Sequence, residues 1–253
     1  MDFWVAFLLF SAGVIAGGMN AIAGGASFFT FPALVASGLP PLVANATNFV
    51  ALVPSNIAAL PAFRSELKRL GRAVIVPMLL GAGGGIIGSL ALLSLGGGLF
   101  ASAVPYLMAM ATILFATAPY IRLITANISQ PDEATNSIGS MILLFVFAIY
   151  GGYFGAGLGQ ITLAALILAG HDDFHTTNAL KNVVISAISL CTVFVYGFSD
   201  AVSWSHALIM MAGAAIGGYL GGRMSKYVPE KALRLSVVVV GSVLTIYYFW
   251  FGV

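Results

Sequence analysis

Two short polar motifs interrupt long apolar stretches of this sequence, at residues 45–48 and 177–182. The second motif, Thr-Asn-Ala-Leu-Lys-Asn, contains Lys181, the one basic residue that falls inside a predicted apolar helix. A lone cation in a hydrocarbon environment is costly unless an anion neutralises it. Lys181 is therefore predicted to be the counter-ion of a bound anion, with Asn178 and Asn182 beside it as hydrogen-bond donors. The alternative is that Lys181 extends to the nearby membrane surface.

The first motif, Asn-Ala-Thr-Asn, has the same kind of side chains but no charge. Asn45, Thr47 and Asn48 offer hydrogen-bond donors that suit an oxyanion which must bind and then leave. Asparagines near helix starts also serve as N-caps or as hydrogen bonds between helices. Capping accounts for one or two of the four asparagines. It does not explain why both motifs keep the cluster.

Glycines form a third element, placed just before two short predicted segments at residues 27–38 and 160–170. Glycine permits unwound backbone, and the half-helix that follows presents N–H groups and a positive dipole end. Such broken helices form anion sites in membrane carriers. The alternative is close helix packing through small residues, which accounts for the glycines of residues 81–88 and 213–222. The residues predicted to line the breaks are Asn20, Gly24, Gly25, Ser27, Gly157, Gly159 and Gln160.

The composition is that of a protein embedded in a lipid bilayer. Hydrophobic residues make up 60% of the chain and charged residues 7%, against about 25% charged in soluble domains. Residues 3–63, 73–121, 134–170 and 235–253 contain no Asp, Glu, Lys or Arg, and a bilayer-spanning helix needs about 20 apolar residues. We expect residue 3 onward to be a retained first helix rather than a cleaved signal peptide.

Several function classes are disfavoured on composition. The net charge of +2 gives no indication of nucleic-acid binding, and the single Cys191 excludes a disulfide framework or a cysteine-rich metal site. No Walker A loop, haem-attachment motif or nucleophile elbow is present, so no cofactor is expected. Residues 171–175, His-Asp-Asp-Phe-His, have the residue types of a metal or proton site, but we interpret them as a solvated loop.

The chain is an internal duplication with an offset of 133 residues. We expect an all-α polytopic protein with two repeats, residues 1–125 and 137–253, joined by a linker at 126–136. Each repeat contains five predicted helical segments, 3–22, 27–38, 42–63, 73–95 and 99–121, then 136–155, 160–170, 176–198, 203–222 and 232–252. The matching pairs are Gly18/Gly151, Ala23/Ala156, Gly24/Gly157, Ala36/Ala169, Asn45/Asn178, Ala46/Ala179, Met78/Met211, Ala82/Ala215, Gly84/Gly217, Gly85/Gly218 and Gly88/Gly221, with Ile87/Leu220 a near match.

Loop charges predict that the two repeats face opposite sides of the membrane. Basic residues cluster between the third and fourth segments of the first repeat, but between the fourth and fifth segments of the second. Since basic loops prefer the cytoplasm, the repeats must be inverted, with both termini in the periplasm. The basic residues are Arg64, Lys68, Arg69 and Arg72 in the first loop, and Arg223, Lys226, Lys231 and Arg234 in the second. Every acid falls in a loop or at a terminus, which disfavours a cation carrier.

The glycine-rich break followed by Phe-Pro-Ala-Leu, then Ala-Asn-Ala-Thr-Asn and the later Thr-Asn-Ala-Leu-Lys-Asn, resembles the TauE/SafE family of sulfite exporters, also called the 4-toluene sulfonate uptake permeases. The resemblance covers residues 3–250. It implies secondary transport of sulfite or organosulfonates across the bacterial cytoplasmic membrane, with both Asn-Ala motifs and Lys181 lining the pathway. The site is not symmetric, because the first repeat has Thr47 and Asn48 where the second has Leu180 and Lys181.

An alternating-access carrier of a small sulfur-containing anion is therefore the leading hypothesis. A carrier of another small organic anion is the alternative. An intramembrane enzyme and a non-transporting scaffold are weaker ones, since the three histidines lie at loops or helix ends and the loops are short. The expected partners are the anion and the lipid bilayer. Small-residue helix faces allow a homodimer without requiring one.

Overall fold

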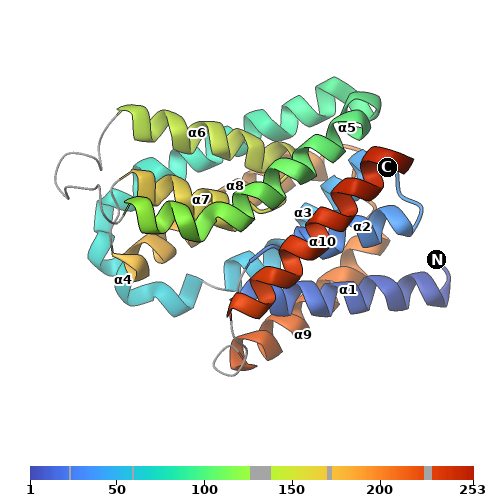
Figure 1. Cartoon of the computed structure of the whole chain (residues 1–253), viewed down its shortest axis with the longest axis horizontal. Coiled ribbons are helices and arrows are strands. Elements are labelled where there is room, and N and C mark those ends of the chain that lie inside the picture. The colour runs from blue at the N-terminus through green and yellow to red at the C-terminus, as the bar shows by residue number, and fades with distance from the viewer. Residues whose placement is uncertain (23, 59, 126–137, 170–172, 225–229) are drawn as a thin grey trace.

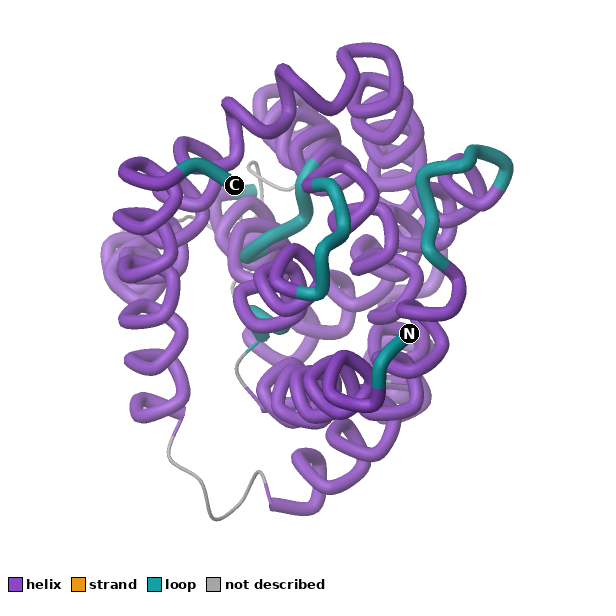
Figure 2. Tube along the Cα trace, turned by 90° about the vertical axis from the view of Figure 1, so that its right-hand side faces the viewer, coloured by secondary structure: helices purple, strands orange, loops and turns teal. Residues whose placement is uncertain are grey.

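The computed structural model describes residues 1–22, 24–58, 60–125, 138–169, 173–224 and 230–253, and this part of the chain is all α-helical with no strand. The linker predicted at 126–136 lies outside the described residues, as do His171 and Asp172 of the histidine motif. In Figure 2 the described loops between the helices, drawn in teal, are short. The helices are α1 (Phe3–Ile22), α2 (Ser27–Ala36), α3 (Pro41–Ala58), η1 (Leu60–Phe63), α4 (Arg64–Leu70), η2 (Gly71–Val74), α5 (Ile75–Thr125), α6 (Ile138–Tyr153), α7 (Leu158–Leu168), α8 (Phe174–Gly197), α9 (Trp204–Met224) and α10 (Glu230–Phe251).

The prediction of an all-α polytopic membrane protein is confirmed, with two local differences. Helix α3 ends at Ala58, short of the predicted residue 63, and Pro61, which has no N–H to donate to the carbonyl of residue 57, lies in the 3-10 turn η1 beyond it. The basic loop that follows contains the short helix α4, which the sequence did not predict. The predicted break after residue 95 is present: Gly96, with φ 79° and ψ 169°, divides α5 into two helical arms.

Four helical stretches in the described residues are long and apolar enough to cross a membrane. Helices α2 and α7 contain only 10 and 11 residues. At about 1.5 Å per residue they are roughly half as long as the hydrocarbon core is thick, so neither can cross alone. In Figure 1 both termini lie at one end of the molecule and α4 lies at the other end.

Glycines bring helices of the two halves into backbone contact. Helix α1 packs along α9, and the first arm of α5 packs along α6. A Cβ on Gly217 of α9 would lie 2.6 Å from the carbonyl carbon of Val14. A Cβ on Gly84 of α5 would lie 2.9 Å from the carbonyl carbon of Ala148. The interpretation of these glycine runs as close-packing surfaces is confirmed.

An aromatic cluster fills the centre of the fold beside the two helix breaks. Phe31 of α2 lies edge-on to Phe154, which follows α6, with ring centroids 5.6 Å apart. Phe100 of the second arm of α5 contacts Phe31 and Phe154 at 6.5 and 6.0 Å. All three rings are buried. They hold α2 and the end of α6 against α5, and so fix the position of both breaks.

Candidate functional site

The two helix breaks predicted from the glycines are present. Gly24 and Gly25 separate α1 from α2 with φ angles of 77° and 84°, and Gly157 precedes α7 with φ 70°. These values lie in the left-handed region that a side chain disfavours. Replacing these glycines would strain the backbone at the turn where each short helix begins.

The breaks face each other across the two halves of the chain. A Cβ on Gly24 would lie 3.8 Å from Nε2 of Gln160, in the first turn of α7. A Cβ on Gly157 would lie 3.8 Å from the ring of Phe28, in the first turn of α2. Each break therefore lies beside the start of the other half's short helix. Gly159 lies on the opposite side of that turn, where a Cβ would be 4.0 Å from Ile185 of α8.

Some backbone donors at the start of α2 are already used. The N–H of Phe28 donates to the carbonyl of Gly25 at 3.1 Å, and the N–H of Phe29 donates to Ala26 at 3.0 Å. At the start of α7 the N–H of Gln160 donates to Gly157 at 3.0 Å. Donors for an anion at the first break must therefore come from residues 25–27.

Asn48 joins α3 to the start of α2. Its Nδ2 donates to Oγ of Ser27 at 3.1 Å, and its Oδ1 accepts from the hydroxyl of Thr30. Asn48 and Thr30 are almost fully buried. The sequence grouped Asn48 and Ser27 in one site, and the structure brings them together. It adds Thr30, which the sequence analysis missed because a lone threonine in an apolar helix gives no distinct signal.

Asn45 and Thr47 are also fully buried, but they contact other elements. Nδ2 of Asn45 donates to the carbonyl of Tyr153, the last residue of α6, at 2.9 Å. Oδ1 of Asn45 has no hydrogen-bond partner in the described structure. The hydroxyl of Thr47 accepts from the N–H of Ser203, just before α9, at 3.0 Å. The motif of residues 45–48 thus spreads over three neighbours.

A polar network that the sequence analysis missed links α1, α3 and α8. Nδ2 of Asn20 donates to Oγ of Ser55 at 3.0 Å and to Oδ1 of Asn56 at 3.2 Å. Nδ2 of Asn56 donates to Oγ of Ser189 at 3.0 Å, and Oγ of Ser186 donates to the carbonyl of Asn56 at 3.3 Å. Asn56 and Ser189 are 133 residues apart, the offset of the internal duplication. The presence of polar residues at two positions related by this offset is the sequence pattern that could have predicted this network.

Helix α8 carries a polar stripe that contains two of the predicted site residues. Asn178, Asn182, Ser186 and Ser189 recur at spacings of three and four residues and so share one face. Nδ2 of Asn182 donates to the carbonyl of Asn178 at 2.9 Å, within the same helix. Lys181 is half-buried and lies seven residues into α8, about 10 Å from the helix start. It projects beside this stripe rather than from it.

The start of α8 is capped and charged outside the membrane. Thr176 donates from its hydroxyl and from its N–H to the carboxylate of Asp173, and these bonds lower the pKa of Asp173. Arg69 of α4 pairs with the same carboxylate at 3.4 Å. This pair holds α4 against the start of α8. Among the described residues no group of three metal-ligating side chains occurs.

The family described as "Sulfite exporter TauE/SafE" matches residues 9–248. The chain is 28% identical over 97% of its length to "Probable membrane transporter protein ORF9" of Sinorhizobium sp, and covers 93% of that protein. It is 24% identical over 94% of its length to a "Probable membrane transporter protein" of Haemophilus influenzae, covering 92% of it. It is 25% identical over 94% of its length to YfcA of Escherichia coli K12, also named a "Probable membrane transporter protein", covering 87% of it. No solved structure matches the chain.

Proposed function

Because the chain belongs to the sulfite exporter TauE/SafE family and is a multi-pass membrane transporter, we propose that it exports sulfite or small organosulfonates by alternating access. The observation that supports this proposal most directly is the hydrogen bond between Asn48 and Ser27. The positions 133 residues further on are Lys181 and Gln160. Lys181, a cation seven residues into α8, thus takes the place of a residue that contacts a helix break.

This equivalence gives Lys181 a specific neighbour. Helices α7 and α8 pack together, as α2 and α3 do. In the first half, the side chain at position 48 reaches the first residue of α2. By this equivalence the side chain of Lys181 would extend toward the first turn of α7, where Gln160 lies beside Gly24. An anion held by Lys181 would therefore lie at the point where the two breaks meet.

The chemistry around this point suits an anion. Among the described residues, every buried polar side chain is neutral. An anion would therefore encounter one ammonium group and neutral donors. An ammonium group beside such a neutral polar lining favours the binding of an anion over that of a cation. The proposed lining consists of Asn20, Ser27, Asn48, Gln160 and Lys181, while Asn45 and Thr47 position α3.

Three observations support inverted repeats, residues 1–125 and 137–253. Asn56 donates to Ser189, its counterpart at the 133-residue offset. Equivalent side chains meet only near an axis that relates the two halves. Helix α1 begins at the end of the molecule that holds both termini, and α6 begins at the opposite end (Figure 1). The helix pairs also fit this relation: α1 packs on α9 and the equivalent pair, α6 and the first arm of α5, pack together in the same way.

The proposed orientation places α4 in the cytoplasm. Arg64, Lys68 and Arg69 lie on α4 and Arg72 directly follows it, and basic segments stay on the cytoplasmic side. Both termini lie at the opposite end in Figure 1 and so face the periplasm of a bacterial inner membrane. Export then means movement from the α4 end toward the termini.

The test is sulfite and methanesulfonate flux in proteoliposomes containing wild-type protein, Lys181→Ala or Lys181→Arg. Loss of a desolvated charge partner costs about 2–5 kcal/mol, so Lys181→Ala should lower flux at low substrate roughly thirtyfold or more. Lys181→Arg keeps the charge and should retain part of the flux. Arg72→Ala, an exposed cation on η2, is the matched control. Undiminished flux in Lys181→Ala would remove the counter-ion role, and flux of carboxylates alone would point to another organic anion.

A further inference from the structure

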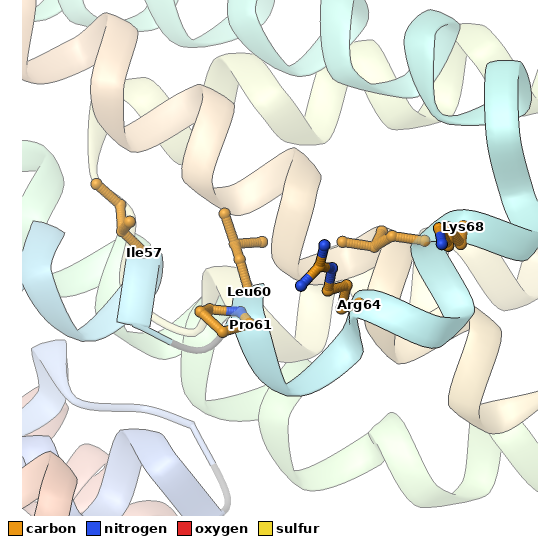
Figure 3. A pocket seen from close by; sticks show the side chains of 6 residues that line it. Ile57, Leu60, Pro61, Arg64 and Lys68 are labelled. Atoms are coloured by element: carbon orange, nitrogen blue, oxygen red, sulfur yellow. The ribbon is translucent and has the colours of Figure 1, made fainter.

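A pocket of about 620 Å³ opens where α3 gives way to η1 and α4. It combines two cations with an apolar wall, and no part of the central site explains it. Figure 3 shows its side chains along one side of this segment, with the guanidinium of Arg64 between Leu60 and Lys68. The lining residues are Ile57, Leu60, Pro61, Arg64, Leu67 and Lys68.

The two cations have no acidic partner among the described residues. Arg69 of the same helix pairs with Asp173 at 3.4 Å, but neither Arg64 nor Lys68 forms an ion pair there. They stand four residues apart and so share one face of α4. Glu66 stands two residues from each, which points it away from that face, and its carboxylate accepts from Ser65. Within the described part of the chain, the pocket therefore presents a double positive charge with no carboxylate paired to it.

The apolar wall is unusual for a solvated loop. Ile57 is 37% exposed, and Leu60 and Leu67 are half-buried beside the cations. A hydrated inorganic anion would leave this wall in water. An anion with a hydrocarbon group would cover it, and each methylene removed from water raises affinity up to about fourfold.

The pocket adjoins the polar network that leads inward. Ile57 directly follows Asn56, which bonds to Ser189 at 3.0 Å and accepts from Asn20 at 3.2 Å. Asn20 lies at the end of α1, four residues before Gly24. The polar network therefore lies between the segment that forms the pocket and the segment that leads to the first break.

We propose that this pocket is a cytoplasmic capture site for organic monoanions, in which Arg64 and Lys68 bind the sulfonate and the apolar wall binds a short hydrocarbon group. This deepens the proposed function and rests on it, because the captured anion is the cargo of the central site. It assigns the preferred cargo to organosulfonates with an apolar group rather than to bare sulfite.

The experiment compares hexanesulfonate with methanesulfonate in inside-out membrane vesicles, where the α4 end faces the medium under the proposed orientation. The double variant Arg64→Gln/Lys68→Gln should raise the KM for both anions about five- to tenfold and leave kcat unchanged, because only initial capture is weakened. Ile57→Ser should raise the KM for hexanesulfonate alone. Arg72→Gln removes a cation from the same segment outside the pocket and should change neither value.

The outcomes separate this inference from the proposed function. An unchanged KM in the double variant, together with lost flux in Lys181→Ala, overturns the capture site and leaves the central site standing. The reverse result removes the counter-ion role and keeps the capture site. If wild type transports neither anion, the proposed function falls, and titration of hexanesulfonate into protein in phosphatidylcholine nanodiscs decides the pocket: weaker binding to the double variant supports it and equal binding overturns it.

Anionic lipid, like the proposed cargo, combines an anionic group with hydrocarbon. A final experiment therefore distinguishes between the two ligands. Proteoliposomes are made of phosphatidylcholine alone or with phosphatidylglycerol. A raised KM in the double variant in both lipids supports cargo capture. A defect that appears only with phosphatidylglycerol identifies the pocket as a lipid site and overturns the proposal.

Discussion

The contact between α1 and α9 predicts a large effect from a single methyl group. In Gly217→Ala the added Cβ would overlap the carbonyl oxygen of Val14 and lie 2.6 and 2.7 Å from its carbonyl carbon and Cα. Carbon atoms make favourable contact at about 3.5–4.0 Å, so α1 would have to move by about 1 Å. The atoms in the way are backbone, and no side-chain rotation can relieve the overlap.

Overpacking of this kind costs about 1–3 kcal/mol, whereas alanine gains about 0.5–1 kcal/mol over glycine in a helix. We expect Gly217→Ala to lower the free energy of unfolding by about 1–2 kcal/mol. Gly98→Ala is the matched control, because a Cβ there meets no atom within 4 Å, and it should be neutral or stabilising. The measurement is the midpoint of unfolding in mixed micelles with increasing sodium dodecyl sulfate, followed by tryptophan fluorescence. Equal midpoints for the two variants would refute the close contact.

Three further predictions concern the axis, the cap of α8 and the orientation. A double-mutant cycle with Asn56→Ala and Ser189→Ala should give a coupling of about 0.6 kcal/mol, and at most about 1.7; a value of zero would show that the two side chains do not interact. Hydrogen bonds from Thr176 lower the pKa of Asp173, so the stabilisation they give is full above the unfolded pKa of about 4 and is lost as the pH falls below it. The difference in melting temperature between wild type and Asp173→Ala should therefore shrink below about pH 4; a difference that grows there would contradict the sign. Alkaline phosphatase fused after Val253 should be active and a fusion after Arg72 inactive, and the opposite pattern would invert the proposed topology.

Helix positions were predictable because the segments between helices contain residues, chiefly glycine, that are known to interrupt helices. Long uncharged runs gave the helices, and Gly24, Gly25 and Gly96 gave the breaks. Helix α4 was not predicted because its seven residues, with four charges, resemble a solvated loop. It lies against the start of α8, where Arg69 pairs with Asp173, a contact between segments 104 residues apart. No local pattern encodes such a pairing.

The candidate site was predictable where residues of one half contact each other. Ser27 and Asn48 were grouped from their places near one break and at one helix start, and they are hydrogen-bonded. The network around Asn56 was missed because serine and asparagine inside apolar helices carry no charge, and their partners depend on how α3 is rotated against α8. Residues 45–48 were expected to act together. They spread over three neighbours because consecutive helical positions point in different directions.

The departure from symmetry at positions 48 and 181 is what a carrier of anions requires. In the first half, Asn48 satisfies both of its polar groups against Ser27 and Thr30, and so fixes α3 to α2. A second ammonium group at that position would hold the same anion twice and oppose its release, since each charge-assisted bond is roughly twice as strong as a neutral one. Under the proposed mechanism, a single ammonium on α8 and a neutral, fully bonded Asn48 on α3 would bind the anion and still let it leave. Asn48→Lys should therefore tighten binding of methanesulfonate and lower its turnover; faster turnover in this variant would show that a second charge at this position does not limit release.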